Sequence, residues 1–179
     1  MKLATLSAIA LTAGVLVAGA AYGQQKPSGG APDLNAVPDK MPFNVPFGTP
    51  VSYQQAQAVI AAAIAEANKR SWPEDFAVVD PAGDLVAFAR MDGAQLASIA
   101  IAEHKARTAA RYRRPTIIFE NAVQKFGLTY IMSLDDVIAS RGGIPLVVDG
   151  KIIGAVGCSG GTGSQDQTLC EAAIKALGK

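Results

Sequence analysis

Apolar residues recur along the chain at two spacings, and each spacing predicts one type of element. Between residues 53 and 70 they return every three or four positions, which is typical of an amphipathic helix, and Ser52 is a suitable N-cap. The short apolar runs at 76–79 and 85–89 are typical of strands. The turn residues at 81–84 separate these runs, so the two strands are expected to form a β-hairpin.

The second half of the chain repeats this alternation. Asp92-Gly93 ends the first hairpin, and Pro115 ends the helical pattern that follows it. The predicted elements after residue 93 are a helix at 94–112, a shorter helix at 116–124, strands at 144–148 and 151–156 around an Asp149-Gly150 turn, and a helix at 164–177. Residues 133–141 fit neither spacing. Glycine-rich residues 157–163 are expected to connect the last strand to the last helix.

The order of these elements predicts the fold class. Two hairpins alternate with helices, and the strands of a hairpin are antiparallel. We therefore predict an α/β fold of the α+β type, in which an antiparallel sheet of two hairpins is flanked by helices. A doubly wound parallel sheet is not expected, and no internal repeat is visible.

Two segments precede the predicted domain at 52–179. Residues 1–23 combine Lys2, an apolar run, and small residues (Ala21 and Gly23) at a cleavage site, so we expect a signal peptide. An uncleaved anchor helix is the alternative, although many residues of the run are alanine or glycine. Residues 24–51 contain six of the ten prolines and are expected to form an extended arm. The expected location is therefore periplasmic or secreted.

Composition and charge narrow the functional classes. Half of the residues are hydrophobic and the net charge is +1, so no overall field would attract nucleic acid or an anionic membrane. We expect no nucleic-acid partner and no membrane span after cleavage. Cys158 and Cys170 are the only cysteines. In an oxidising compartment they could form a disulfide, or they could remain two thiols, and their spacing leaves both open.

Four fragments in the same order resemble the GlcG/HbpS family, formerly a domain of unknown function. They are residues 79–94, 105–109, 142–146 and 154–166. The resemblance extends over about residues 52–178 and implies a profilin-like fold, homo-oligomers and, in several members, haem binding. Some members occur beside two-component sensors, which implies a sensor or accessory protein as a further partner.

His104 is the only histidine of the chain, and imidazole is a common axial ligand of haem iron. On the predicted helix, His104, Thr108 and Arg111 share one face, and Arg107 lies beside them. Guanidinium groups next to an iron ligand suit the propionates of a porphyrin. This face is the predicted haem site, with His104 as the candidate iron ligand. A solvated basic face or an ion-pair network between subunits is the alternative.

Two tyrosines and one threonine compete with His104. Tyr112 and Tyr53 are rivals because tyrosinate can ligate ferric haem, although ordinary packing explains both. The resemblance implies a haem contact at Thr108, whose hydroxyl is a weak ligand. Tyr112 and Thr108 are therefore included among the cofactor-binding residues.

Other motifs support function less well. Residues 157–161 match G-x-S-x-G around Ser159, but no histidine follows and no parallel sheet is expected, so a hydrolase is not favoured. The glycine-rich stretch precedes a helix and could hold an anion, or it could simply allow close packing. The two cysteines and His104 lack the spacing of a zinc site.

The sequence thus predicts an exported haem- or tetrapyrrole-binding protein for haem buffering, transport or redox sensing. One alternative is an enzyme that degrades haem or acts on a small carboxylate. The other is a non-catalytic oligomeric interaction module.

Overall fold

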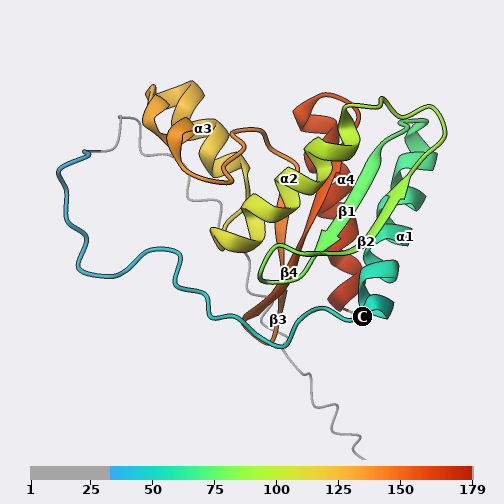
Figure 1. Cartoon of the computed structure of the whole chain (residues 1–179), viewed down its shortest axis with the longest axis horizontal. Coiled ribbons are helices and arrows are strands. Elements are labelled where there is room, and N and C mark those ends of the chain that lie inside the picture. Colours follow the sequence, from blue (N-terminus) through green and yellow to red (C-terminus); the bar gives the residue numbers. More distant parts are fainter. Residues whose placement is uncertain (1–32, 179) are drawn as a thin grey trace, which may run out of the picture.

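The computed structural model describes residues 33–178 (Figure 1), so the predicted signal peptide and the first part of the arm lie outside the described residues. The elements are α1 (Tyr53–Arg70), β1 (Asp75–Val79), β2 (Leu85–Arg90), α2 (Ser98–Arg111), α3 (Ile117–Phe126), β3 (Gly143–Val148), β4 (Lys151–Ser159) and α4 (Gly163–Ile174), with short 3-10 helices η1 at Thr129–Ser133 and η2 at Lys175–Gly178. This order agrees with the one predicted from the hydrophobic pattern.

The four strands form one sheet in the order β2-β1-β4-β3, and every neighbouring pair is antiparallel. The two hairpins are joined along β1 and β4, where Phe76 lies opposite Cys158. The prediction of an antiparallel sheet made from two hairpins is confirmed.

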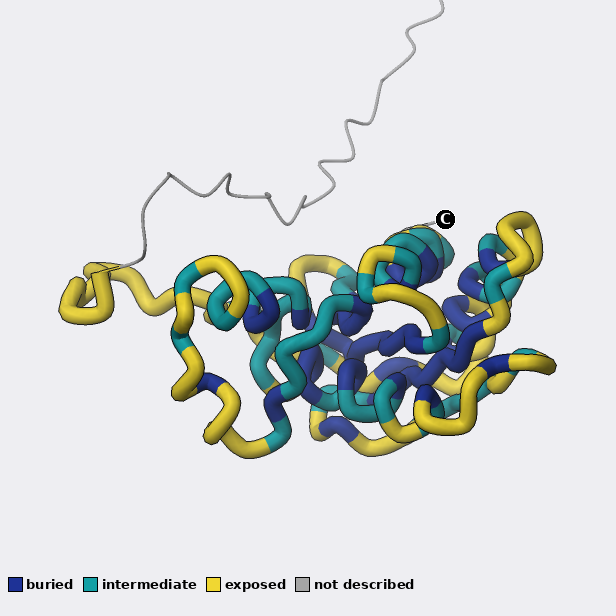
Figure 2. Tube along the Cα trace, turned by 90° about the horizontal axis from the view of Figure 1, so that it is seen from above, coloured by how far each residue is buried: buried dark blue, intermediate teal, exposed yellow. Residues whose placement is uncertain are grey.

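Helices cover both faces of the sheet (Figure 1). Helices α1 and α4 pack on one face through a core that includes Val59, Phe76 and Leu169. Helix α2 packs on the other face, where Ala102 and Ala106 meet the inner side chains of β1 and β4. Figure 2 shows the buried residues concentrated in the strands and in the inner sides of these helices.

Helix α2 lies very close to the sheet because two strand positions have no side chain. A Cβ atom on Gly157 would lie 2.0 Å from the carbonyl oxygen of Ala102, and one on Gly143 would lie 2.3 Å from that of Lys105. Gly157 was expected in a loop, but β4 continues to Ser159 because Asp75 pairs with Ser159. The glycines therefore serve close packing between strand and helix.

Helix boundaries differ from the prediction where turns compete with the helix. Helix α2 begins at Ser98 rather than residue 94, because Gly93 has a φ of 86° and the amide of Ala94 donates to the carbonyl of Met91. Helix α3 continues to Phe126 and ends at Gly127, which is left-handed. Helix α4 ends at Ile174, and its predicted last turn is the 3-10 helix η2.

The last part of the arm lies on the domain. The amide of Gly48 donates to the carbonyl of Ile152, and the amide of Ile152 donates to the carbonyl of Pro46, both over 2.8 Å. The guanidinium of Arg114 lies 3.6 Å from the ring centroid of Phe43, and burial lowers the pKa of this arginine. Within residues 33–178, no helix is long and apolar enough to cross a membrane.

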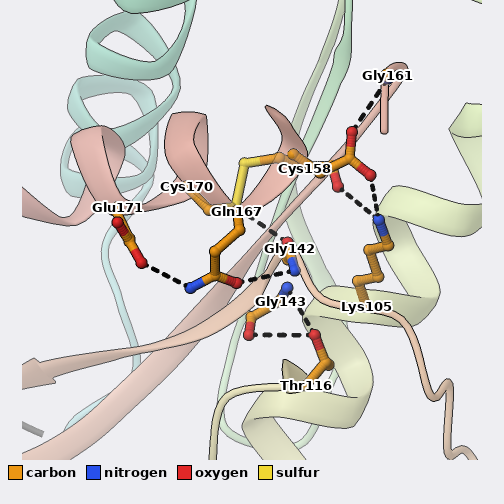
Figure 3. Close-up of a disulfide and its surroundings, with 10 residues drawn as sticks. Lys105, Thr116, Gly142, Gly143, Cys158, Gly161, Gln167, Cys170 and Glu171 are labelled. Atoms are coloured by element: carbon orange, nitrogen blue, oxygen red, sulfur yellow. Dashed lines mark hydrogen bonds and ion pairs between the residues drawn. A yellow bond between two sulfur atoms is a disulfide. The ribbon is translucent and has the colours of Figure 1, made fainter. Parts of the chain in front are cut away.

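A disulfide joins β4 to α4 (Figure 3). The sulfur atoms of Cys158 and Cys170 are 2.09 Å apart and their Cα atoms 5.8 Å apart. Both residues are completely buried in the core between the sheet and the helices α1 and α4.

Removing this disulfide is expected to lower the free energy of unfolding by about 3 kcal/mol, the chain-entropy value for a loop of this length. The change is Cys158→Ala with Cys170→Ala, and the measurement is urea unfolding with and without dithiothreitol. The reductant should lower the midpoint of the wild type and leave the double variant unchanged. An identical midpoint for oxidised and reduced wild type would contradict the prediction.

Candidate functional site on helix α2

The outer face of α2 carries one imidazole between apolar and cationic side chains. Ala100 and Ile101 precede His104 by about one helical turn, and Arg107 and Arg111 follow it by about one and two turns. The side chain of His104 is half-buried, and no hydrogen bond among residues 33–178 involves its ring. This stripe, residues 100, 101, 104, 107 and 111, is called the α2 stripe below.

The two arginines of the stripe are held by Asp136. Arg111 Nη1 pairs with Asp136 Oδ2, and Arg107 Nη1 lies 3.8 Å from Asp136 Oδ1. Arg111 Nε also donates to the carbonyl of Ala82 in the turn of the first hairpin, over 2.7 Å. The side chains nevertheless remain 35% and 43% exposed. Arg111 is therefore anchored by hydrogen bonds to two segments, Arg107 is held only by a longer ion pair, and both guanidinium groups still present donors to a ligand.

Thr108 and Tyr112 are engaged with the backbone of the segment before β3. Thr108 is buried, and its hydroxyl donates to the carbonyl of Asp136 over 2.5 Å and accepts from the amide of Ile138 over 3.2 Å. The Tyr112 hydroxyl donates to the carbonyl of Asp135 over 2.6 Å. These two hydroxyl groups hold residues 135–138 against α2. Of the predicted haem-binding side chains, His104, Arg107 and Arg111 remain available to a ligand.

The other tyrosine considered, Tyr53, is not near this site. It lies at the start of α1, which covers the opposite face of the sheet (Figure 1). Its side chain is exposed. Its hydroxyl accepts a hydrogen bond from Gln57 Nε2 over 2.8 Å.

Asp136 belongs to this candidate site, although the sequence pattern did not indicate it. It lies in the segment that fitted neither helical nor strand spacing, and its φ of 59° is left-handed. Aspartate is one of the side chains that tolerate this conformation. Two consecutive acids at 135–136 in a segment of mixed pattern were the available signal, but only the fold brings Asp136 to α2.

Lys105, also on α2, points to the interior. Its Nζ lies 2.5 Å from Asp166 Oδ2 and donates to the carbonyl of Cys158 over 3.2 Å (Figure 3). Asp166 Oδ1 accepts from the amide of Gly161. The exposed fractions of the two side chains are 1% and 4%. Lys105 therefore does not belong to a solvated basic face.

Two further acids are buried at the start of β1, and the first of them, Glu74, lies beside this ion pair. Glu74 and Asp75 are fully buried, and within residues 33–178 their four oxygens accept no hydrogen bond, although a protonated Glu74 shares its proton with the Asp166 carboxylate. Burial and then the negative charge of Asp166 raise the pKa of Glu74 to about 8, against the opposing charge of Lys105. Burial raises the pKa of Asp75 as well. In the sequence, the buried position of this acidic pair was indicated by its place directly before a wholly apolar run.

The glycine-rich stretch before α4 does not form a nucleophile elbow, and three of its amides are already engaged. Ser159 is buried at the end of β4, not exposed on a sharp turn. The amides of Gly161, Thr162 and Gln165 already donate to side chains of the same segment. Within residues 33–178, no group of three or more metal-binding side chains is present.

Comparisons with known proteins identify relatives over most of the domain. The family model described as "haem degrading protein HbpS-like" matches residues 51–175. The protein GlcG of Escherichia coli K12 is 44% identical over 109 residues, which are 61% of this chain and 81% of that protein.

Two solved structures share the fold. HbpS has a TM-score of 0.68 at 25% identity, and the match covers 78% of this chain and 99% of that chain. A complex of PduOC with haem has a TM-score of 0.65 at 30% identity, covering 72% of this chain and 95% of that chain.

Proposed function

The chain belongs to the GlcG/HbpS family, and from this membership and the α2 stripe we propose that it binds haem or a related tetrapyrrole. The family description names haem, and the similar structure of PduOC contains haem. The observation in this chain that supports the proposal most is the half-buried imidazole of His104 between apolar and cationic neighbours on one helix face.

The donor set of the α2 stripe fits a haem. The porphyrin has an apolar ring, a central iron and two carboxylates at one edge. Ala100 and Ile101 offer apolar contact, His104 offers a nitrogen ligand, and the arginines offer paired donors in that order along the helix. Bound there, haem would supply an iron centre that can change redox state.

Each residue of the site has a role in this proposal. The imidazole of His104 holds the iron, and Arg107 and Arg111 hold the propionates. Asp136 positions both guanidinium groups, since it contacts each of them. Thr108 and Tyr112 are positioning residues, because their hydroxyl groups fix the segment that carries Asp136.

The proposal also includes a homo-oligomeric assembly and a location outside the cytoplasm. The α2 stripe does not line the cavity beside Gly48 and Lys151 or the cavity beside Trp72 and Gly161, so a haem on it would leave much of its ring open to solvent. A second copy of the chain that covers the ring would reduce this exposure, which supports a homo-oligomer. The buried disulfide is typical of proteins in oxidising compartments, which supports a periplasmic or secreted protein for haem buffering, transport or redox sensing.

The predicted result of a haemin titration of residues 24–179 is a saturable Soret shift. His104→Ala should bind haemin at least about tenfold more weakly and move the band, because the iron loses its nitrogen ligand. Glu103→Ala, on the same helix but off the stripe, is the matched control and should bind like the wild type. A saturable shift unchanged in His104→Ala would exclude His104 as the iron ligand, and no saturable shift would refute haem binding.

Haem degradation is the second candidate, because the description of the matching family model names it. The same sample, followed over time with ascorbate or peroxide, tests it. If the Soret band disappears with time, and disappears more slowly in His104→Ala than in the wild type, haem is degraded at this site. A stable band would indicate binding without degradation.

A further inference from the structure

The two edges of the sheet differ in how far they are closed. Strand β3 forms one edge, where the Thr116 hydroxyl accepts from the amide of Gly143 and the Thr116 amide donates to its carbonyl, each over 2.9 Å. Pro145, two residues further along β3, has no amide hydrogen to offer. Strand β2 forms the other edge (Figure 1) and contains no proline, lysine or acid. Because sheets commonly protect their edges with such residues, β2 is the edge that remains open to another strand.

The free backbone groups of β2 belong to Phe88 and Arg90. The amide of Met91 donates to the carbonyl of Glu74 over 3.1 Å, which fixes the residues of β2 that bond to β1. Since hydrogen-bonded pairs alternate along an antiparallel ladder, the amides and carbonyls of Phe88 and Arg90 point away from β1. Within residues 33–178 these groups have no hydrogen-bond partner. They are the donors and acceptors that one further antiparallel strand needs.

Strand β2 is complementary to a second copy of itself. When two β2 strands run antiparallel with Ala89 opposite its equivalent, Phe88 of each copy pairs with Arg90 of the partner subunit, and every free group of both strands finds a partner. Phe88 and Arg90 lie on the same face of the strand. Arg90 is exposed and forms no ion pair within the described chain. In this register it meets an aromatic ring, which attracts guanidinium groups, and not a second arginine.

The same pairing brings the second copy to the α2 stripe. Phe88 lies on the face of the sheet that α2 covers, since it packs against the core cluster under α2, but it is only partly buried. The stripe reaches the start of β2, because Arg111 Nε donates to the carbonyl of Ala82 in the turn before this strand. The two-fold axis of an antiparallel strand pair is perpendicular to the sheet, so the α2 helices of both copies lie on the same face.

We propose that two copies of this chain join along β2, antiparallel and centred on Ala89, into one continuous sheet that carries both α2 stripes on one face. The partly exposed ring of Phe88 in each copy is covered by Arg90 of the partner subunit, and the open edge of the sheet is closed. For a haem on the stripe, the second copy supplies a wall that the single chain lacks. This last point rests on the proposed function, whereas the pairing itself rests on β2 alone.

Cysteine cross-linking tests the register of this pairing. Ala89 and its equivalent form a pair without hydrogen bonds, whose Cα atoms would lie about 4.5 Å apart, a spacing that a disulfide can bridge. Ala89→Cys should therefore form a covalent dimer when the assembled protein is oxidised with diamide. Ala87→Cys, on the same face of the same strand, is the matched control. Ala87 and its equivalent would lie about 13 Å apart along the strands, so this variant should not cross-link.

Arg90→Pro tests the interface itself. Proline removes an amide hydrogen that β1 does not use, so circular dichroism should show a folded protein, while the pairing between copies loses hydrogen bonds. In sedimentation velocity without haem, the wild type should form assemblies with an even number of copies. The variant should have at most about half of that mass at the same concentration. Lys151→Ala removes an exposed cation at the start of β4 and should assemble like the wild type. If Arg90→Pro does not fold, the two cysteine variants decide the matter.

Several results would overturn the proposal. They are a monomeric wild type, an assembly that folded Arg90→Pro leaves unchanged, no cross-linking of Ala89→Cys, or equally efficient cross-linking of Ala87→Cys. All of these measurements are made without haem, so their outcome is independent of the haemin titration. A chain that binds haemin but remains monomeric would contradict this inference alone. A chain that pairs through β2 but binds no haemin would contradict the proposed function alone.

Discussion

A Lys105→Met variant is expected to lose about 3–5 kcal/mol of its free energy of unfolding. The substitution leaves Asp166 as a buried carboxylate without its partner, since the two side chains are only 1% and 4% exposed and lie 2.5 Å apart. The unpaired Asp166 carboxylate would also lie beside the buried Glu74. Urea unfolding at pH 7, followed by circular dichroism, measures the change.

A double variant and a surface control make this prediction specific. Lys105→Met combined with Asp166→Asn removes both charges and keeps an acceptor for the amide of Gly161, so it should recover most of the loss. Lys151→Met replaces an exposed cation and should stay within about 0.5 kcal/mol of the wild type. A single variant as stable as the wild type would show that the pair contributes nothing.

The stability of the wild type relative to Glu74→Gln is expected to fall as the pH rises from about 4.5 to about 8. The pKa of Glu74 is raised in the folded protein, so over this window the folded state keeps a proton that the unfolded state has released. Stability then falls with increasing pH, by about 1.4 kcal/mol for each unit over which this difference is complete. Below the window both states are protonated, and above it both are ionised.

Urea unfolding of both proteins at four pH values across this window gives the measurement. The difference between the two proteins isolates Glu74, because Asp75, whose pKa burial also raises, is present in both. A difference that does not vary with pH would mean that the Glu74 carboxyl has an ordinary pKa and meets water or a counter-charge in solution.

Local patterns predicted the elements well for a physical reason. Secondary structure depends on residues that are close in sequence. Examples are a capping side chain, an Asp-Gly turn, and a helical or alternating spacing of apolar residues. Ser52 caps α1 as expected, and its hydroxyl accepts from the amide of Gln55. The errors occurred where a distant segment decides the outcome. Strand β4 continues to Ser159 only because β1 supplies a partner for these residues.

The candidate haem site was predicted in part. Helical spacing alone places His104, Thr108 and Arg111 on one face of α2. It does not show that Asp136 pairs with both arginines, or that Thr108 and Tyr112 are occupied by the backbone of residues 135–138. These contacts join residues more than twenty positions apart, through a segment without regular structure.

The sequence by itself thus determined the order of the elements, the antiparallel pairing within each hairpin and the helix that carries His104, because these depend on neighbours along the chain. Only the tertiary structure decided which polar groups lose contact with water. Lys105 and Asp166 are 61 positions apart, and Glu74 joins them only when β1, α2 and α4 pack together. Burial, pairing and the resulting pKa depend on distance in space, and no spacing within the chain encodes that distance.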